Sequence, residues 1–404
     1  MPAAASTLAH VPLVGESPAP LPAPLRFTLD GDATLESHLA RICERVRQGV
    51  ERLIPAGRLE GILLGGGYGR GEGGVLRTAS GDQPYNDLEF YVLLRGSTLL
   101  NERRHGRALG ELAHDLGSAA GIEVEFKVLS TAWLRRLPVS MFSYDLVQGH
   151  RRVCGDEALL RGCAHHRQAA AIPPAEATRL LFNRCSGLLF ARARLDRLPF
   201  AAADADYAER NVAKARLALG DVVLTVCHEY HWSCRERARR LLALPAPEGL
   251  ACLPALREEH VRGVDFKLHP HRSRRSAADL REDLWRISLL ACQVWFWLEH
   301  RRLGVAFRHP SEYALHPANK CPETSSLRNW LVNARRFGWR ELAGRRAFRY
   351  PRERLLRALP VLLWRPVMLG NPQVRASLQR DLRTTAVDQP GLLAAYTRLW
   401  EGFR

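Results

Sequence analysis

Lysine is scarce in this sequence of 404 residues, although the chain is strongly basic. It occupies only positions 127, 214, 267 and 320, so nearly all of the 59 basic residues are arginine, and the formal net charge is +17. Such a charge raises nucleic acid as a partner. The basic residues are dispersed along the chain, however, and a compositional bias of the source would produce the same excess. Nucleic acid is therefore an open partner that the sequence does not favour.

Other absences narrow the class of protein. The nine cysteines are odd in number and irregularly spaced, so no disulfide framework is expected. The longest apolar stretch, 287–298, contains Ser288 and Gln293 and is far shorter than the ~20 residues that span a bilayer. The N-terminus lacks a basic segment followed by an apolar core, the pattern of a signal peptide. We therefore expect a cytoplasmic protein without a membrane partner.

Composition and periodicity divide the chain into three parts. Residues 1–28 are rich in alanine and proline, and we expect a flexible tail. Residues 29–150 follow the order helix, strand, loop, strand, helix, strand, which is typical of a small mixed α/β domain. Residues 151–404 are expected to form an all-α domain. The predicted fold class is thus α+β, a small mixed-sheet domain followed by a larger helical domain.

The predicted elements follow from the spacing of apolar residues. In the first domain we expect helices at 33–54 and 103–119, strands at 59–64, 87–94 and 122–129, and a short helix or turn around Val75. In the second domain we expect helices at 178–195, 206–230, 279–303, 327–337, 353–364 and 374–382.

A glycine-rich loop and two carboxylates form the motif that carries chemistry. The first predicted strand leads into Gly65, Gly66 and Gly67, and the second carries Asp87 and Glu89. Alternate strand residues share a face, so the two carboxylates point the same way. Carboxylate oxygens suit hard divalent cations, and glycines let backbone N–H groups approach phosphates. This equipment is suited to phosphoryl or nucleotidyl transfer with two metal ions.

The pattern is similar to the nucleotidyltransferase superfamily, the family of DNA polymerase beta and of the aminoglycoside and antitoxin-type nucleotidyltransferases. The resemblance covers about residues 30–135 and rests on Leu64, Gly65, Gly66, Arg70, Gly71, Asp87 and Glu89. The family's third carboxylate lies on a later strand of the same sheet. Glu125 is our choice for it, although Glu123 points to the same face of the predicted strand and stays open.

The resemblance implies a function and a set of roles. The protein would be a Mg²⁺-dependent enzyme, with Mn²⁺ as a substitute, that moves a nucleoside monophosphate from a nucleoside triphosphate to a hydroxyl. Acceptors among small molecules or proteins are favoured, and an RNA or DNA end is an alternative. The metal ligands would be Asp87, Glu89 and Glu125. The phosphate-binding residues would be Gly65, Gly66, Gly67, Arg70 and, from the helical domain, Lys214, with Arg184 as a further candidate.

The loop departs from the family pattern in two ways. Gly66 and Gly67 stand where many members have a serine, so backbone N–H groups and Arg70 would have to bind the phosphate. The interval between the glycines and Asp87 is longer than usual, which leaves room for an extra turn at 78–85. Glu72 is expected to form a salt bridge with Arg70 and position it.

Other interpretations of the motif compete with this one. Asp87 and Glu89 could lie on a solvated strand face, and the protein could be a catalytically silent adaptor that retains the fold. The glycine spacing matches a dinucleotide-binding fingerprint by chance, and the absence of a following Lys-Ser/Thr excludes a P-loop. The segment Cys227-His228-x-x-His231-x-x-Cys234 has zinc-type ligands. It lies on a predicted helix, so buried helix residues are favoured there, as they are for 295–297 over a base-stacking platform.

Overall fold

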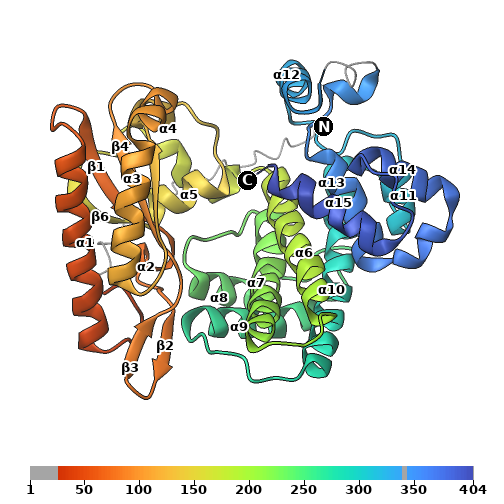
Figure 1. Cartoon of the computed structure of the whole chain (residues 1–404), viewed down its shortest axis with the longest axis horizontal. Helices are drawn as coiled ribbons and strands as arrows, with labels where there is room; N and C mark the ends of the chain where they lie inside the picture. Colours follow the sequence, from red (N-terminus) through yellow and green to blue (C-terminus); the bar gives the residue numbers. More distant parts are fainter. Residues whose placement is uncertain (1–25, 339–343, 404) are drawn as a thin grey trace, which may run out of the picture.

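The computed structural model describes residues 26–338 and 344–403, and this part of the chain forms an α/β domain followed by a helical domain (Figure 1). The α+β class expected from the sequence is confirmed. Most of the expected tail, residues 1–28, lies outside the described residues. Its last part is not a tail, because Phe27 and Thr28 are buried and their N–H groups donate to the Glu36 carboxylate.

A four-stranded mixed sheet forms the centre of the first domain. Its strand order is β5-β4-β1-β6; β4 and β5 run parallel, and the other pairs are antiparallel. The elements of this domain are α1 (Ala33–Leu53), β1 (Leu59–Leu64), α2 (Gly66–Gly69), β2 (Val75–Thr78), β3 (Gly81–Pro84), β4 (Leu88–Leu94), α3 (Thr98–Ala120), β5 (Val124–Leu129), α4 (Thr131–Leu134), α5 (Met141–Gln148) and β6 (Arg151–Gly155).

The two central strands are apolar on both faces because helices cover both. Helices α1 and α3 pack on the face that carries Ile62 and Phe90 (Figure 1). The other face, with Leu63 and Leu93, is covered by residues of α4 and α5. This double burial explains the continuous apolar runs of β1 and β4. The charged residues of these two strands, Glu60 and Glu89, each stand second in their strand.

Two parts of the sheet domain differ from the sequence-based expectation. Strand β6 pairs with β1 as far as Gly155, so the domain boundary expected at residue 150 is too early. The apolar pattern of the sequence does not indicate β6, because this arginine-rich strand lies at the sheet edge and lacks apolar alternation. Residues 75–84 form the hairpin β2–β3, where a short helix or turn was expected. This hairpin fills the long interval between the glycines and Asp87.

The second domain is helical throughout its regular elements. They are α6 (Pro174–Leu195), α7 (Ala202–Val226), α8 (Cys234–Ala243), α9 (Leu253–Leu268), α10 (Ala277–Leu303), α11 (Pro310–Leu315), α12 (Ser326–Phe337), α13 (Glu353–Trp364), α14 (Pro372–Leu382) and α15 (Gln389–Glu401), with short 3₁₀ turns η1 (Ala164–Arg167), η2 (Ala169–Ala171), η4 (Arg345–Phe348) and η5 (Pro366–Gly370). All six expected helices are present, and α8, α9, α11 and α15 were not expected.

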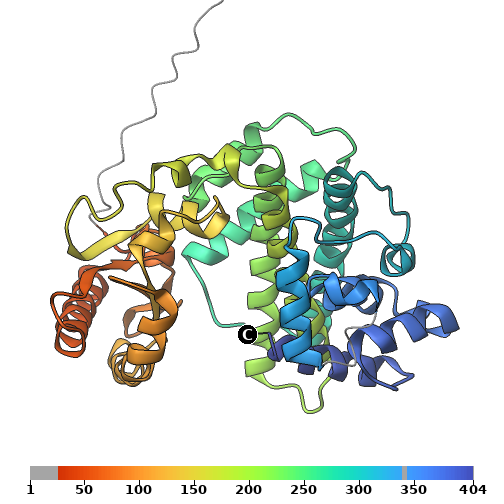
Figure 2. The same ribbon diagram turned by 90° about the horizontal axis from the view of Figure 1, so that it is seen from above.

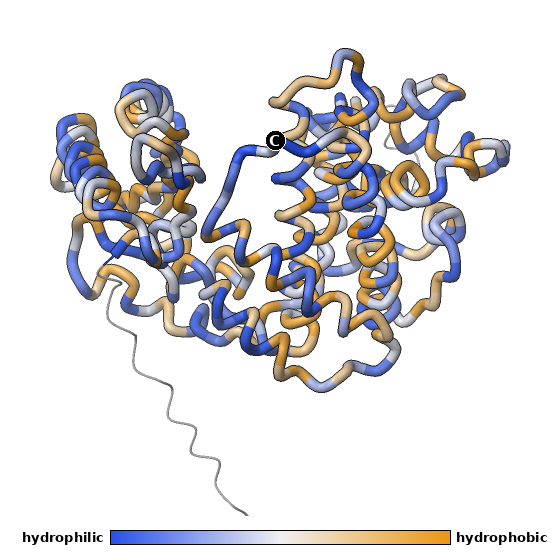
Figure 3. Tube along the Cα trace, turned by 90° about the horizontal axis from the view of Figure 1, so that it is seen from below, coloured by the Kyte–Doolittle hydropathy of each residue, from blue (hydrophilic) through white to orange (hydrophobic). Residues whose placement is uncertain are grey.

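The helices pack around one large apolar core. Residues of α6, α7, α10, α13 and α15 meet in it. Hydrophobic and hydrophilic residues alternate along the helices (Figure 3). The aromatic run belongs to this core, since Trp295 and Trp297 are buried. None of the helices in the described ranges combines the length and apolarity that crossing a bilayer requires.

The two domains lie side by side (Figure 2) and are joined by buried charged residues, which we call the interdomain seam. The Glu72 carboxylate, from the glycine-rich loop, accepts hydrogen bonds from Ser233 Oγ at 2.5 Å and the Cys234 N–H at 2.9 Å, at the start of α8. Lys267 Nζ of α9 lies 3.8 Å away. Glu72 therefore anchors the helical domain, and the expected pairing of Glu72 with Arg70 is wrong.

Arg70 belongs to the same seam. Its guanidinium is largely buried and lies 2.9 Å from Asp145 of α5. The Tyr230 hydroxyl of the helical domain donates to the same carboxylate, at 3.2 Å from Oδ2. Within the helical domain, Arg237 Nε of α8 forms an ion pair with Asp221 of α7 at 2.7 Å. The seam thus fixes how the glycine-rich loop sits against α7 and α8.

Substitution Glu72→Gln should destabilise the protein at neutral pH. Burial by itself raises the pKa of Glu72, but the Lys267 ammonium and the two hydrogen bonds lower it to about 2. Ionised Glu72 therefore adds stability above the usual carboxyl pKa, and this is lost as pH falls toward 2. We expect a loss of about 2–4 kcal/mol at pH 7, seen as a lower midpoint of urea unfolding, and a smaller difference at pH 3.

The matched control is Glu44→Gln on α1. The pKa of Glu44 is also lowered to about 2, through Arg47, but Glu44 lies on the solvent-exposed face. We expect its midpoint to equal that of the wild type. Equal midpoints for Glu72→Gln and the wild type at pH 7 would show that the seam does not depend on this charge.

Candidate active site

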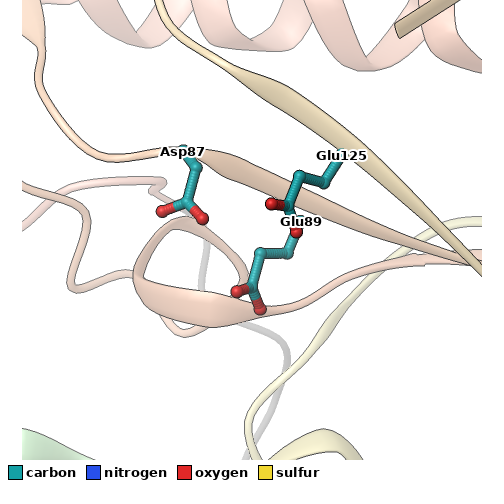
Figure 4. Close-up of side chains that lie close together, drawn as sticks. All are labelled: Asp87, Glu89 and Glu125. Atoms are coloured by element: carbon teal, nitrogen blue, oxygen red, sulfur yellow. The ribbon is translucent and has the colours of Figure 1, made fainter. Parts of the chain in front are cut away.

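Three carboxylates meet at the N-terminal ends of β4 and β5. Asp87 directly precedes β4, Glu89 is its second residue, and Glu125 on β5 lies opposite Glu89 in the parallel register. One oxygen from each side chain lies within 4.8 Å of the others. Figure 4 shows the carboxylates converging from the two neighbouring strands. We call these residues the carboxylate cluster.

The structure distinguishes between the two candidates for the third carboxylate. Glu123 precedes β5, and its backbone carbonyl accepts the Leu88 N–H. Its side chain lines a surface hollow with residues from the end of α3. Glu125 is the residue that lies with Asp87 and Glu89. The choice could not be made from the sequence, because both positions have the same strand parity.

Two further side chains contact the cluster. Lys127 Nζ lies 3.2 Å from Glu125 Oε2 and 3.5 Å from Glu89 Oε1. The Tyr91 hydroxyl donates to Glu89 Oε2 at 3.0 Å. Sequence reasoning missed both, although a signal was present, since each stands two residues after a cluster carboxylate and so shares its strand face.

The electrostatics of the cluster reflect crowded negative charge. Surrounding protein atoms displace water from the Asp87 carboxylate, and the charges of Glu89 and Glu125 add to this effect, so the pKa of Asp87 is raised. Partial burial opposes the charge on Lys127, but the Glu89 and Glu125 carboxylates outweigh it and raise the pKa of Lys127. The cluster is thus a site where added positive charge is favourable.

The glycines of the loop are required mainly by close packing. A Cβ on Gly65 would lie 2.5 Å from the Tyr91 ring, and one on Gly67 would lie 2.8 Å from the Glu72 carbonyl oxygen. The Gly65 N–H donates to the Glu89 carbonyl within the sheet. Gly66 has φ of +61°, and its missing side chain would face Glu89 Oε2 at 3.6 Å. Of the three glycines, Gly66 is therefore the one beside the cluster.

The Arg70 side chain is already paired within the protein. Its buried guanidinium is neutralised by Asp145, so the phosphate-binding role expected for Arg70 is not supported. The local sequence gave no signal of this, because the partner lies 75 residues further along the chain.

Basic residues of the helical domain supply the positive charge instead. Lys214 on α7 lies close enough to Asp87 for their charges to interact. Its pKa is lowered, first by desolvation and then by the nearby Arg184 and Arg210. The side chains of these three form no hydrogen bond or ion pair with any described residue. We call them the basic trio; Arg210, one helical turn before Lys214, was missed in the sequence.

The zinc-type segment has a different structure from the one expected. Helix α7 ends at Val226, and His228 has φ of +63°, which takes the chain out of the helix. His228 Nδ1 lies 3.0 Å from the Ala170 carbonyl, and His231 accepts the Ser233 N–H. Within the described residues, the carboxylate cluster is the grouping whose ligand atoms could share a metal ion.

Comparison with known proteins adds no relative. No protein-family model matches the sequence, and no curated protein is similar enough to be matched.

Substitution Asp87→Asn should stabilise the metal-free protein. An acid whose pKa is raised by folding destabilises the folded state when ionised, so the penalty is present at pH 7 and relieved as pH falls through the usual carboxyl range. We expect the midpoint of thermal unfolding to rise by about 1–2 °C at pH 7 with a chelator present.

Asp115→Asn on the exposed face of α3 is the control, and we expect no change. A lower midpoint for Asp87→Asn than for the wild type would mean that Asp87 has a structural partner and is not held under repulsion.

Proposed function

We propose that the protein is a Mg²⁺-dependent nucleotidyltransferase that moves a nucleoside monophosphate from a nucleoside triphosphate to a hydroxyl acceptor and releases pyrophosphate. The observation that carries the proposal is the pairing of the carboxylate cluster with the basic trio, whose side chains form no hydrogen bond or close ion pair with any described residue and whose Lys214 lies near Asp87. A cation-binding group and an anion-binding group set against each other suit a metal–polyphosphate ligand.

The residues of the cluster fit a divalent cation. Its oxygens lie within 4.8 Å of one another, and oxygens bound to one Mg²⁺ lie up to about 4.2 Å apart, so small side-chain movements would suffice. Asp87 is the most accessible of the three, and Glu89 and Glu125 are half-buried. A bound cation would supply neutralisation of phosphate charge and activation of the attacking hydroxyl.

The protein's own residues would hold the reactants in place. Lys214, Arg184 and Arg210 would bind the outer phosphates, so that the α-phosphate lies toward Asp87 and Glu89. The acceptor oxygen forms a bond to the α-phosphorus as the bond from that phosphorus to the bridging oxygen breaks. Pyrophosphate leaves, and the hydroxyl loses its proton.

The mixed sheet with carboxylates on two parallel strands supports the resemblance to the nucleotidyltransferase superfamily noted in the sequence. Small-molecule and protein acceptors remain the favoured classes, with nucleic-acid ends as the alternative. A cytoplasmic location suits an enzyme that uses nucleoside triphosphates and Mg²⁺.

A catalytically silent protein is the second candidate, and Lys127 is the observation that favours it. Its ammonium group already compensates part of the charge of Glu89 and Glu125. A silent protein that retained the fold would need such compensation in place of a metal.

A transfer assay tests the proposal. The purified protein, with Mg²⁺ or Mn²⁺ and each α-labelled nucleoside triphosphate, is supplied with cell extract as a source of acceptors. We expect labelled product, with Asp87→Asn reducing the rate by at least about 10³-fold because it removes a metal ligand. The absence of label together with no binding of triphosphate would favour the silent protein.

Substitution Lys214→Met should weaken binding of the triphosphate with little effect on stability. Loss of one charge-assisted contact corresponds to about 10–100-fold in affinity. Calorimetric titration with a non-hydrolysable triphosphate and Mn²⁺ measures it. Arg308→Met, an exposed position before α11, is the control and should bind as the wild type. Unchanged affinity for Lys214→Met would place the triphosphate elsewhere.

A further inference from the structure

The Lys127 ammonium group lies among the oxygens that a second metal ion would use. It contacts one oxygen of Glu125 at 3.2 Å and one oxygen of Glu89 at 3.5 Å. A divalent cation shared by Glu89 and Glu125 would need the same oxygens and the same space. The two cations exclude each other unless the lysine side chain moves.

The sheet holds Lys127 in this position. In the parallel register of β4 and β5, Lys127 lies opposite Tyr91 as Glu125 lies opposite Glu89. The ammonium group lies 5.7 Å from the centre of the Tyr91 ring, and the Tyr91 hydroxyl donates to the other oxygen of Glu89. Both oxygens of Glu89 thus have partners from the same pair of strands.

Asp87 differs from the two glutamates. Its carboxylate accepts no hydrogen bond and forms no ion pair with any other described residue. It is also the exposed member of the cluster. The side of the cluster at Asp87 is therefore open to a cation, whereas the side between Glu89 and Glu125 is filled by Lys127.

The charges of the three carboxylates and of Lys127 also favour one metal ion over two. Three ionised carboxylates carry three negative charges, and Lys127 reduces the total to two. For the cluster and Lys127 alone, one divalent cation would balance the remaining two charges, and a second would add its charge beside the Lys127 ammonium.

We propose that Lys127 is a positioning residue that takes the place of a second metal ion, so that the carboxylate cluster binds one divalent cation, on the Asp87 side. Lys127 holds Glu89 and Glu125 together through its contacts with one oxygen of each. The inference rests on the proposed function, because it requires a divalent cation at this cluster.

The test is the number of Mn²⁺ ions bound per chain, measured from the free-ion signal in electron paramagnetic resonance without nucleotide. We expect one ion for the wild type and one for Lys127→Arg, which keeps the charge. Lys127→Met, which keeps the length and removes the charge, should bind a second ion or bind the first at least about tenfold more tightly. Lys127 is partly exposed, so both variants should fold.

The control is Arg152→Met on β6 of the same sheet, where the arginine pairs with Glu157 at 2.9 Å and does not contact the cluster. It should bind one ion with wild-type affinity. Two ions in the wild type, or identical binding by Lys127→Met and the wild type, would overturn the role of Lys127 and leave the proposed function intact. No bound Mn²⁺ in any variant, with or without a non-hydrolysable triphosphate, would remove the metal site and the proposed function together.

Discussion

Mutual repulsion of three carboxylates is the constraint on which this site depends. Asp87, Glu89 and Glu125 are held with oxygens within 4.8 Å, and each such pair of charges costs on the order of a few kcal/mol near a protein surface. The packing of the sheet offsets this repulsion, because β1 and β4 are buried on both faces and are held in place by that burial. The paired register of β4 and β5 then decides which acids meet.

The interdomain seam attaches the sheet domain, which carries these carboxylates, to the helical domain. Glu72 belongs to the glycine-rich loop and is bound at the start of α8, so a buried carboxylate fixes the loop to the helical domain. Arg70, two residues earlier, is held by Asp145 and, through it, by Tyr230. Across the same pair of domains, Lys214 of the basic trio lies close enough to Asp87 for their charges to interact. The seam therefore uses Arg70, which a local interpretation assigns to phosphate binding, and Glu72, which it pairs with Arg70.

Much of the architecture follows from the sequence, and the limits have physical causes. Apolar periodicity locates α1, β1, β4 and most of the helices of the second domain, because each buries one regular face. The pair Asp87 and Glu89 follows from strand alternation. Strand β6, at the sheet edge, and the hairpin β2–β3, a separate two-stranded sheet, are not predicted because they are short and their sequences lack apolar alternation. The role of Arg70 escapes it too, because contacts 75 residues apart leave no local pattern.

The central claim is that the carboxylate cluster binds the divalent cation of a nucleotidyltransferase. Its most direct test is a crystal structure of the protein with Mn²⁺ and a non-hydrolysable nucleoside triphosphate, with the metal located by anomalous scattering. We expect a Mn²⁺ peak about 2.1 Å from oxygens of Asp87 and Glu89, with the phosphates between it and Lys214. A triphosphate bound elsewhere, or a cluster without an anomalous peak, would contradict the account.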